Sequence, residues 1–137
     1  QDPEPLPYLR LAGDFTFDIH LEARLQTAKM NAPHTLTRTN FQYLYWSVSQ
    51  QLAHHTVGGC NLQPGDLLAS GTISGPTEDS RGCMLELTWR GANPLTLPSG
   101  ETRKWLEDDD TLAITGWCEG KGYRVGFGEV SGSVRAA

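Results

Sequence analysis

The sequence lacks long apolar runs and clusters of basic residues. No apolar segment approaches the roughly 18 residues that a membrane-spanning helix needs. The formal net charge of the 137 residues is −5, and the 11 Lys and Arg residues are scattered, whereas nucleic-acid binding requires clustered basic side chains. We therefore expect a soluble, cytosolic protein with neither a nucleic acid nor a membrane as its partner.

Cysteine is also scarce, and its spacing matches no common motif. Cys60, Cys83 and Cys118 are odd in number, lie far apart and form no C-x-x-C pair. This pattern favours buried, reduced thiols over a disulfide or a metal site.

The length predicts a single unit, residues 1–137. A chain of this size can bury one moderate core but not two. It begins with Gln1 rather than Met, and residues 1–7 contain three prolines, which predict an extended arm. We expect this to be a piece of a longer chain.

Alternating apolar and polar residues predict a long half-buried strand from Phe15 to Gln26. His20 falls on its polar face, where we expect a solvated side chain because no second His or Cys lies at ligand spacing. Shorter apolar segments separated by Gly, Pro and Asn predict further strands. These are Thr35–Thr37, Asp66–Ile73, Cys83–Arg90, Leu95–Leu97, Arg103–Leu106, Thr111–Cys118, Tyr123–Phe127 and Val130–Val134.

The segment from Asn40 to Val57 predicts the principal helix. Its apolar residues recur at helical spacing, Asn40 is a good N-cap, and Gly58-Gly59 can end the helix. His54 and His55 would point about 100° apart, so they are not expected to share a metal. The fold class is therefore mainly β with one principal helix, a mixed β-sandwich or roll.

Four consecutive acidic residues, 107–110, suggest either a calcium loop or a solvated turn. A calcium loop of the EF-hand type needs alternating ligands and a closing Glu, and neither is present. We expect a solvated turn.

Glu86 is the first candidate for chemistry. In the predicted strand 83–90 it shares a face with Met84 and lies in the middle of the strand, where a carboxylate needs a partner. The residues leave two alternatives open, a salt bridge to Arg90 or Arg24 and a catalytic pairing with a histidine.

Thr72 is the second candidate. It follows Gly71 at the end of a predicted apolar strand, where small residues allow a ligand to approach the backbone. Its N–H and hydroxyl suit an anionic group, and the alternative is a threonine that caps its own turn.

These segments also resemble a known family. The run from Gln50 to Gly75, QQLAHHTVGGCNLQPGDLLASGTISG, is similar to the fumarylacetoacetate hydrolases. The similarity extends in order along the whole chain, through QDP and LPYL near the start, FTFDI, NF with YW, MLEL and GYRVGFG. The chain resembles the C-terminal portion of the family's catalytic domain.

The resemblance implies hydrolysis of the carbon–carbon bond of fumarylacetoacetate to fumarate and acetoacetate, in tyrosine and phenylalanine breakdown. It implies a divalent metal, calcium or magnesium, a histidine that activates water, and a glutamate that orients the histidine. Glu86 matches that glutamate, and Thr72 matches the threonine that holds a substrate carboxylate. We expect the metal ligands and the base histidine upstream of Gln1, so the chain alone is expected to be inactive.

The resemblance further implies a cytosolic homodimer that acts on a small diketo acid. Two alternatives stay open. The first is a binding or interaction domain that keeps the fold without the chemistry, and the second is another diketo-acid hydrolase or decarboxylase of the superfamily.

Overall fold

The computed structural model describes residues 1–13 and 16–136, and it has two antiparallel sheets. The larger sheet has four strands in the order β2-β1-β5-β6, and the smaller one pairs β3 with β4. The strands are β1 (His20–Gln26), β2 (His34–Asn40), β3 (Leu95–Thr96), β4 (Thr102–Arg103), β5 (Thr111–Gly120) and β6 (Tyr123–Ser133).

Helical elements are few and short, apart from α1. They are α1 (Val48–Val57), α2 (Met84–Leu87), and the 3₁₀ turns η1 (Pro7–Leu9), η2 (Phe41–Tyr43) and η3 (Glu78–Ser80). The expected fold class, mainly β with one principal helix, is confirmed. No helix among the described residues has the length and apolar character needed to cross a membrane.

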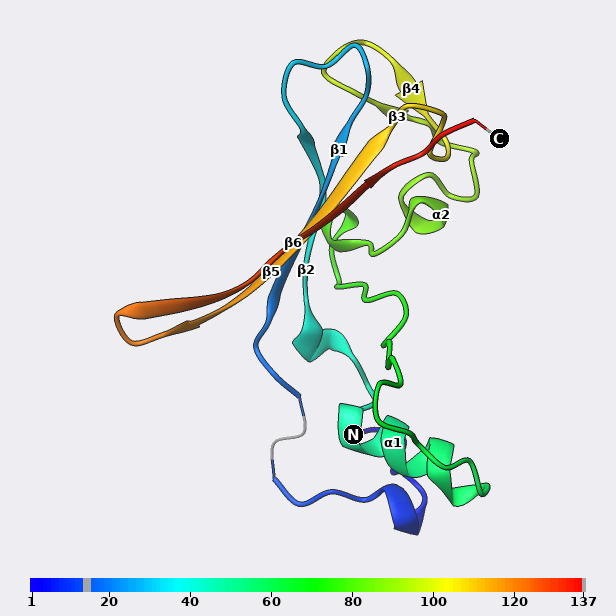
Figure 1. Cartoon of the computed structure of the whole chain (residues 1–137), viewed down its shortest axis with the longest axis vertical. Helices are drawn as coiled ribbons and strands as arrows, with labels where there is room; N and C mark the ends of the chain where they lie inside the picture. Colours follow the sequence, from blue (N-terminus) through cyan, green and yellow to red (C-terminus); the bar gives the residue numbers. More distant parts are fainter. Residues whose placement is uncertain (14–15, 137) are drawn as a thin grey trace.

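The molecule is elongated, with the large sheet between two ends (Figure 1). The small sheet and α2 lie near one end of β1, and α1 lies at the opposite end beside the N-terminus. The β5–β6 hairpin projects sideways beyond the other strands. The segment that joins α1 to α2 runs along one side of the molecule (Figure 1). Thr72 lies in this segment, and Glu86 lies in α2, which follows it.

β1 is shorter than the predicted strand from Phe15 to Gln26. It begins at His20, which pairs with Asn40 and Trp117, and Phe15 itself lies outside the described residues. The neighbouring strand β2 ends at Asn40, because the Asn40 side chain accepts a hydrogen bond from the Gln42 N–H and starts η2. One more backbone hydrogen bond, from the Phe41 N–H to the Ile19 carbonyl oxygen at 2.9 Å, follows the His20–Asn40 pair before the two segments separate.

The predicted helix from Asn40 to Val57 is divided in two. Leu44 has extended backbone angles, φ −68° and ψ 133°, and separates η2 from α1. Ser47 then starts α1 with a capping box, in which its hydroxyl accepts from the Gln50 N–H and the Gln50 side chain accepts from the Ser47 N–H. The Ser-x-x-Gln spacing is the signal for this start, and the apolar periodicity alone hides it. Gly59, with φ 90°, follows the helix as expected.

The predicted strand 66–73 is wrong. Residues 66–75 form neither helix nor strand, and the Leu67 side chain is 94% exposed. An apolar segment becomes a strand only when another strand hydrogen-bonds along it. Within the described residues no strand does so.

The predicted strand 83–90 is also wrong, because α2 occupies its centre. Thr88 closes this helical turn by donating its hydroxyl to the Met84 carbonyl oxygen at 2.7 Å. Trp89 and Arg90 then have left-handed backbone angles, φ 50° and 57°, and turn the chain away. Met, Leu and Glu are strong helix formers, so the local preference here outweighed the alternation of apolar residues.

The predicted strand 103–106 is mostly wrong, because β4 shares only Arg103 with it and residues 104–106 are not in a strand. The remaining strand predictions are confirmed in position and differ in length. The predicted strands 123–127 and 130–134 are one strand, β6, and the φ of 81° at Gly128 accompanies a shift in register opposite Thr115 and Trp117. Such a bulge lets a strand continue through a glycine that the sequence pattern reads as a break. β2 and β5 are longer than predicted, and β3 and β4 are shorter.

The buried core lies between the large sheet and the small one. Leu25, Met30 and Leu97 are buried there, with Leu36 and Leu106 packed against them. Beside this core the acidic turn differs from expectation, because Asp110 is only 1% exposed and accepts two hydrogen bonds from the Arg103 guanidinium at 2.9 and 3.0 Å.

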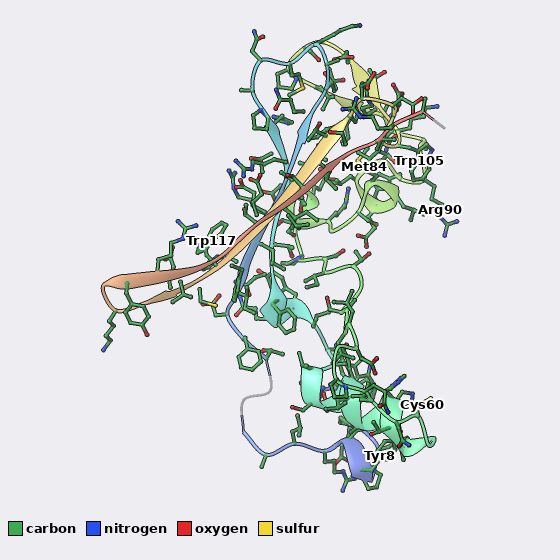
Figure 2. The ribbon with its side chains drawn as sticks, in the orientation of Figure 1. Tyr8, Cys60, Met84, Arg90, Trp105 and Trp117 are labelled. Atoms are coloured by element: carbon green, nitrogen blue, oxygen red, sulfur yellow. The ribbon has the colours of Figure 1, made fainter. Side chains whose placement is uncertain are left out.

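The three cysteines are free, as expected, but they are not buried. Cys60 is exposed, and Cys83 and Cys118 are half-buried. Cys60 lies in the chain that follows α1, at the far end from the core (Figure 2).

Candidate active site

The Glu86 carboxylate folds back onto the residues that precede its helix. Its Oε2 accepts hydrogen bonds from the Ser74 hydroxyl at 2.5 Å and from the Gly82 N–H at 3.2 Å, and the Cys83 thiol lies at 3.5 Å. Three donors therefore converge on one oxygen atom of this side chain. Glu86 is not on a strand face with Met84, as the sequence predicted, but at the end of a one-turn helix.

The hydrogen bonds keep Glu86 ionised. The Ser74 hydroxyl is the largest cause that lowers the pKa of Glu86 below its ordinary value, while partial burial acts in the opposite direction. Cys83, Gly82 and the positive charge of Arg81 lower it further. A carboxyl group with a lowered pKa accepts hydrogen bonds and faces cations at neutral pH, so it is poorly suited to donate a proton.

Glu86 lies in the wall of an open pocket of about 570 Å³. Ser74, Arg81, Leu85 and Trp89 line the same pocket. The Arg81 guanidinium lies 5.0 Å from the centroid of the Trp89 ring, so this cation is held on the pocket wall by the aromatic face. Arg90 lines this pocket as well, so the pocket combines one anion, two cations and an apolar surface.

Gly82 brings the two candidate segments together. A Cβ atom at this position would lie 2.3 Å from the Ile73 carbonyl oxygen and 2.8 Å from the Thr72 methyl carbon. Only glycine permits this approach, and the same residue donates its N–H to Glu86. Gly82 was not singled out from the sequence, although a glycine can mark a close approach of two backbones.

Thr72 lies in the irregular segment and not at the end of a strand. Its side chain is exposed and lines a small hollow that also contains Thr37, Thr39 and Glu22. The Glu22 carboxylate pairs with Arg38 at 2.6 Å, so its charge is offset. Thr72 and Glu86 line different hollows. Ser74, two residues after Thr72, lines the pocket of Glu86 and donates its hydroxyl to the Glu86 carboxylate.

The salt bridges that the sequence left open for Glu86 are not formed within residues 1–13 and 16–136. Arg24 pairs with Glu129 at 2.8 Å and lies 3.5 Å from Glu22. Arg90 points outward from the ribbon next to α2 (Figure 2).

A histidine partner for Glu86 is equally absent from the described part of the chain. His20 stacks on Trp117, and the His54 ring nitrogen Nδ1 lies 2.9 Å from the Tyr8 hydroxyl. His34 and His55 belong to β2 and α1, and neither contributes a hydrogen bond to the carboxylate.

Comparison with known proteins identifies the family. Residues 12–135 match the family described as fumarylacetoacetate (FAA) hydrolase, C-terminal. The chain belongs to the fumarylacetoacetate hydrolase family. The resemblance seen in the sequence is thereby confirmed.

Curated relatives in the fumarylacetoacetate hydrolase family match along the full chain. The sequence is 56% identical to fumarylacetoacetase of Bos taurus and 54% identical to that of Homo sapiens, each over 137 residues. It is 49% identical over 139 residues to fumarylacetoacetase of Dictyostelium discoideum. Each alignment covers 100% of this chain and 33% of the relative, so the chain spans about a third of the length of these relatives.

The resemblance to this family implies a divalent metal, and the described residues do not fit one. They contain no group of three or more His, Cys, Asp or Glu side chains that could hold a metal ion. The acidic turn is engaged with Arg103 through Asp110. We therefore assign no catalytic step to a metal held by these residues.

Proposed function

We propose that this chain supplies part of an active site that hydrolyses the carbon–carbon bond of fumarylacetoacetate to fumarate and acetoacetate. The similar proteins of Bos taurus and Homo sapiens are fumarylacetoacetases, which supports the reaction. The observation that carries the proposal is the Glu86 carboxylate, which three donors hold through Oε2 in the wall of a pocket.

Glu86 is proposed to orient a histidine that lies outside this chain. A carboxylate bonded to one imidazole nitrogen fixes the tautomer and stabilises the imidazolium, and the other nitrogen then takes a proton from water. The lowered pKa of Glu86 supports this role, because the carboxylate must be ionised to do so. A general acid would need a raised pKa.

Thr72 is proposed to hold a carboxylate of the substrate. Its exposed hydroxyl stands beside the Glu86 segment, separated from it by Gly82, which touches both. Such a contact at the far end of a diketo acid would fix the distance between the bound end and the bond that breaks.

The other features implied by the resemblance belong to the same proposal. Calcium or magnesium would be held by carboxylates outside this chain, and the protein would act as a cytosolic homodimer in tyrosine and phenylalanine breakdown. Large apolar side chains on β6, such as Phe127 at 62% exposed and Val130 at 67%, support a further protein surface against this strand.

The central experiment is the substitution Glu86→Gln in the complete protein that carries this chain. Removing the charge should lower kcat by about 10² to 10⁴, the range of a disturbed general base. Steady-state hydrolysis of fumarylacetoacetate gives the readout, and Glu119→Gln, an exposed residue on the projecting hairpin, is the matched control. Unchanged turnover in Glu86→Gln would remove Glu86 from the mechanism.

Thr72 is tested by a kinetic signature of binding. Thr72→Val should raise KM more than it lowers kcat, since a carboxylate contact is shared by the ground and transition states. Thr72→Ser keeps the hydroxyl and should behave like the wild type.

A complete protein with no hydrolysis that still binds the diketo acid in calorimetry would favour the alternative of a binding module.

A further inference from the structure

Ser74 makes the shortest contact to the Glu86 carboxylate, at 2.5 Å. The Ser74 oxygen also accepts a hydrogen bond from the Gly82 N–H at 3.0 Å. This N–H is shared with Glu86 Oε2. Because an ionised carboxylate only accepts hydrogen bonds, the single hydroxyl proton of Ser74 points at Glu86. The serine therefore acts as a donor in a fixed direction.

The three donors all contact the same oxygen atom of the Glu86 carboxylate. Ser74, Gly82 and Cys83 meet Oε2, and no group in residues 1–13 and 16–136 donates to Oε1. A carboxylate held by one oxygen keeps its orientation while the second oxygen remains available to a partner.

The segment that carries Ser74 is itself held in place. The Gly75 N–H donates to the Ser80 carbonyl oxygen at 2.8 Å, which closes the loop from 75 to 80. Ser80 is buried, and its hydroxyl donates to the Thr77 carbonyl oxygen at 2.8 Å. A Cβ at Gly75 would lie 2.6 Å from the Ser80 hydroxyl oxygen, so this approach also requires glycine. The loop therefore leaves Ser74 little freedom to move away from Glu86.

We propose that Ser74 is a positioning residue for the hydrolysis, which fixes the Glu86 carboxylate through Oε2 and leaves Oε1 for the imidazole. This rests on the proposed function, in which Glu86 orients a histidine. Without the serine, the carboxylate rotates among several orientations and spends less time bonded to the imidazole nitrogen. Ser74 touches neither the substrate nor the base in this scheme.

The test compares Ser74→Ala with the wild type in the complete protein. The substitution should lower kcat about tenfold, the order of one lost hydrogen bond to a charged group, with KM nearly unchanged. The acidic limb of the pH profile should also move to higher pH, because the loss of a donor raises the pKa of Glu86. Arg81, the Cys83 thiol and the Gly82 N–H, which also lower the pKa of Glu86, remain in place, as does the charge of Arg90 in the same pocket.

Three matched variants separate positioning from a structural role. Ser74→Thr keeps the hydroxyl and should restore kcat and the acidic limb. If Ser74→Ala does not fold, Ser74→Cys replaces it, because the thiol is a weaker donor of similar size and should also lower kcat. Cys83→Ala removes the weaker contact at 3.5 Å and should lower kcat less than Ser74→Ala does, because a thiol is a weak donor. In a Glu86→Gln background, Ser74→Ala should add less than about twofold, because both residues act through one bond.

The outcomes are distinguishable. If Glu86→Gln lowers kcat and Ser74→Ala does not, the inference on Ser74 is wrong and the proposed function stands. If both single changes leave kcat intact, the proposed role of Glu86 is wrong as well. If Ser74→Ala lowers kcat without moving the acidic limb, or its effect adds fully to that of Glu86→Gln, Ser74 supports the structure and does not position the carboxylate.

Discussion

Two parts of the large sheet, the region packed against the small sheet and the edge strand β6, are held in different ways. Near the small sheet, Leu25 is fully buried, and the Arg103–Asp110 pair is enclosed beside it. Along β6 every residue is exposed, although β5 and β6 pair along almost their whole length. The first part thus depends on packed side chains and a buried ion pair, and the edge strand on backbone hydrogen bonds. The difference predicts where a substitution should cost stability.

The largest effect is expected from Asp110→Ala. The Asp110 carboxylate accepts from Arg103 and from the Glu107 N–H. Its removal leaves the buried Arg103 charge with only the longer contacts to Glu107 at 3.3 Å and Glu101 at 3.4 Å. Together with the lost acceptor of the Glu107 N–H, this should lower the free energy of unfolding by about 3–5 kcal/mol. Urea denaturation of the 137-residue chain measures the loss. Asp108→Ala, in the exposed part of the same turn, should have little effect, and equal losses in the two variants would contradict the contrast.

A second substitution tests the packed core directly. Leu25→Ala removes a fully buried side chain and should lower the free energy of unfolding by about 2–5 kcal/mol through lost burial and the cavity that remains. Leu67→Ala is the control, since Leu67 is 94% exposed. A loss under 1 kcal/mol at Leu25, measured by the same denaturation, would show that the core collapses around the gap.

The sequence predicts a strand only as far as the local pattern agrees with the contacts that the rest of the chain supplies. Strict alternation identified β1, although Leu25 is buried and the other six residues of the strand are half-buried on both faces. The same kind of alternation misled at 83–90, where the Thr88 hydroxyl and the left-handed Trp89 favour a helical turn. An apolar pattern predicts a strand reliably only where a neighbouring strand pairs with it. The predicted strand 66–73 has no such neighbour within the described residues, and its Leu67 side chain is exposed.

The candidate site shows the same limit. Glu86 and Thr72 were singled out from the residue pattern, the resemblance to a family supplied their roles, and those roles stay predictions. Ser74 and Gly82 were missed because their importance comes from contacts between segments that are 8 to 12 residues apart. A serine and a glycine in a polar loop are common in any sequence, and only the geometry distinguishes them.

A smaller effect, with a clear pH dependence, is expected at Glu101. Its carboxylate accepts from the Thr27 hydroxyl at 2.5 Å, and this bond, followed by that from Ser99, lowers the pKa of Glu101. A lowered pKa in the folded state adds stability above the unfolded pKa, and this stability is lost as pH falls through the folded value. Glu101→Gln should therefore lower the melting temperature at pH 7 but not in strong acid. A pH-independent difference would contradict this assignment.

The smallest effect is expected on the exposed hairpin. Val130 is 67% exposed on β6, and Val130→Thr keeps the branched side chain that suits a strand. The free energy of unfolding of the chain should change by less than about 0.5 kcal/mol, as for surface sites in general. Denaturation in parallel with Leu25→Ala gives the comparison under identical conditions. A loss above about 2 kcal/mol at Val130 would exceed what an exposed side chain can contribute, and it would show that β6 is covered in solution.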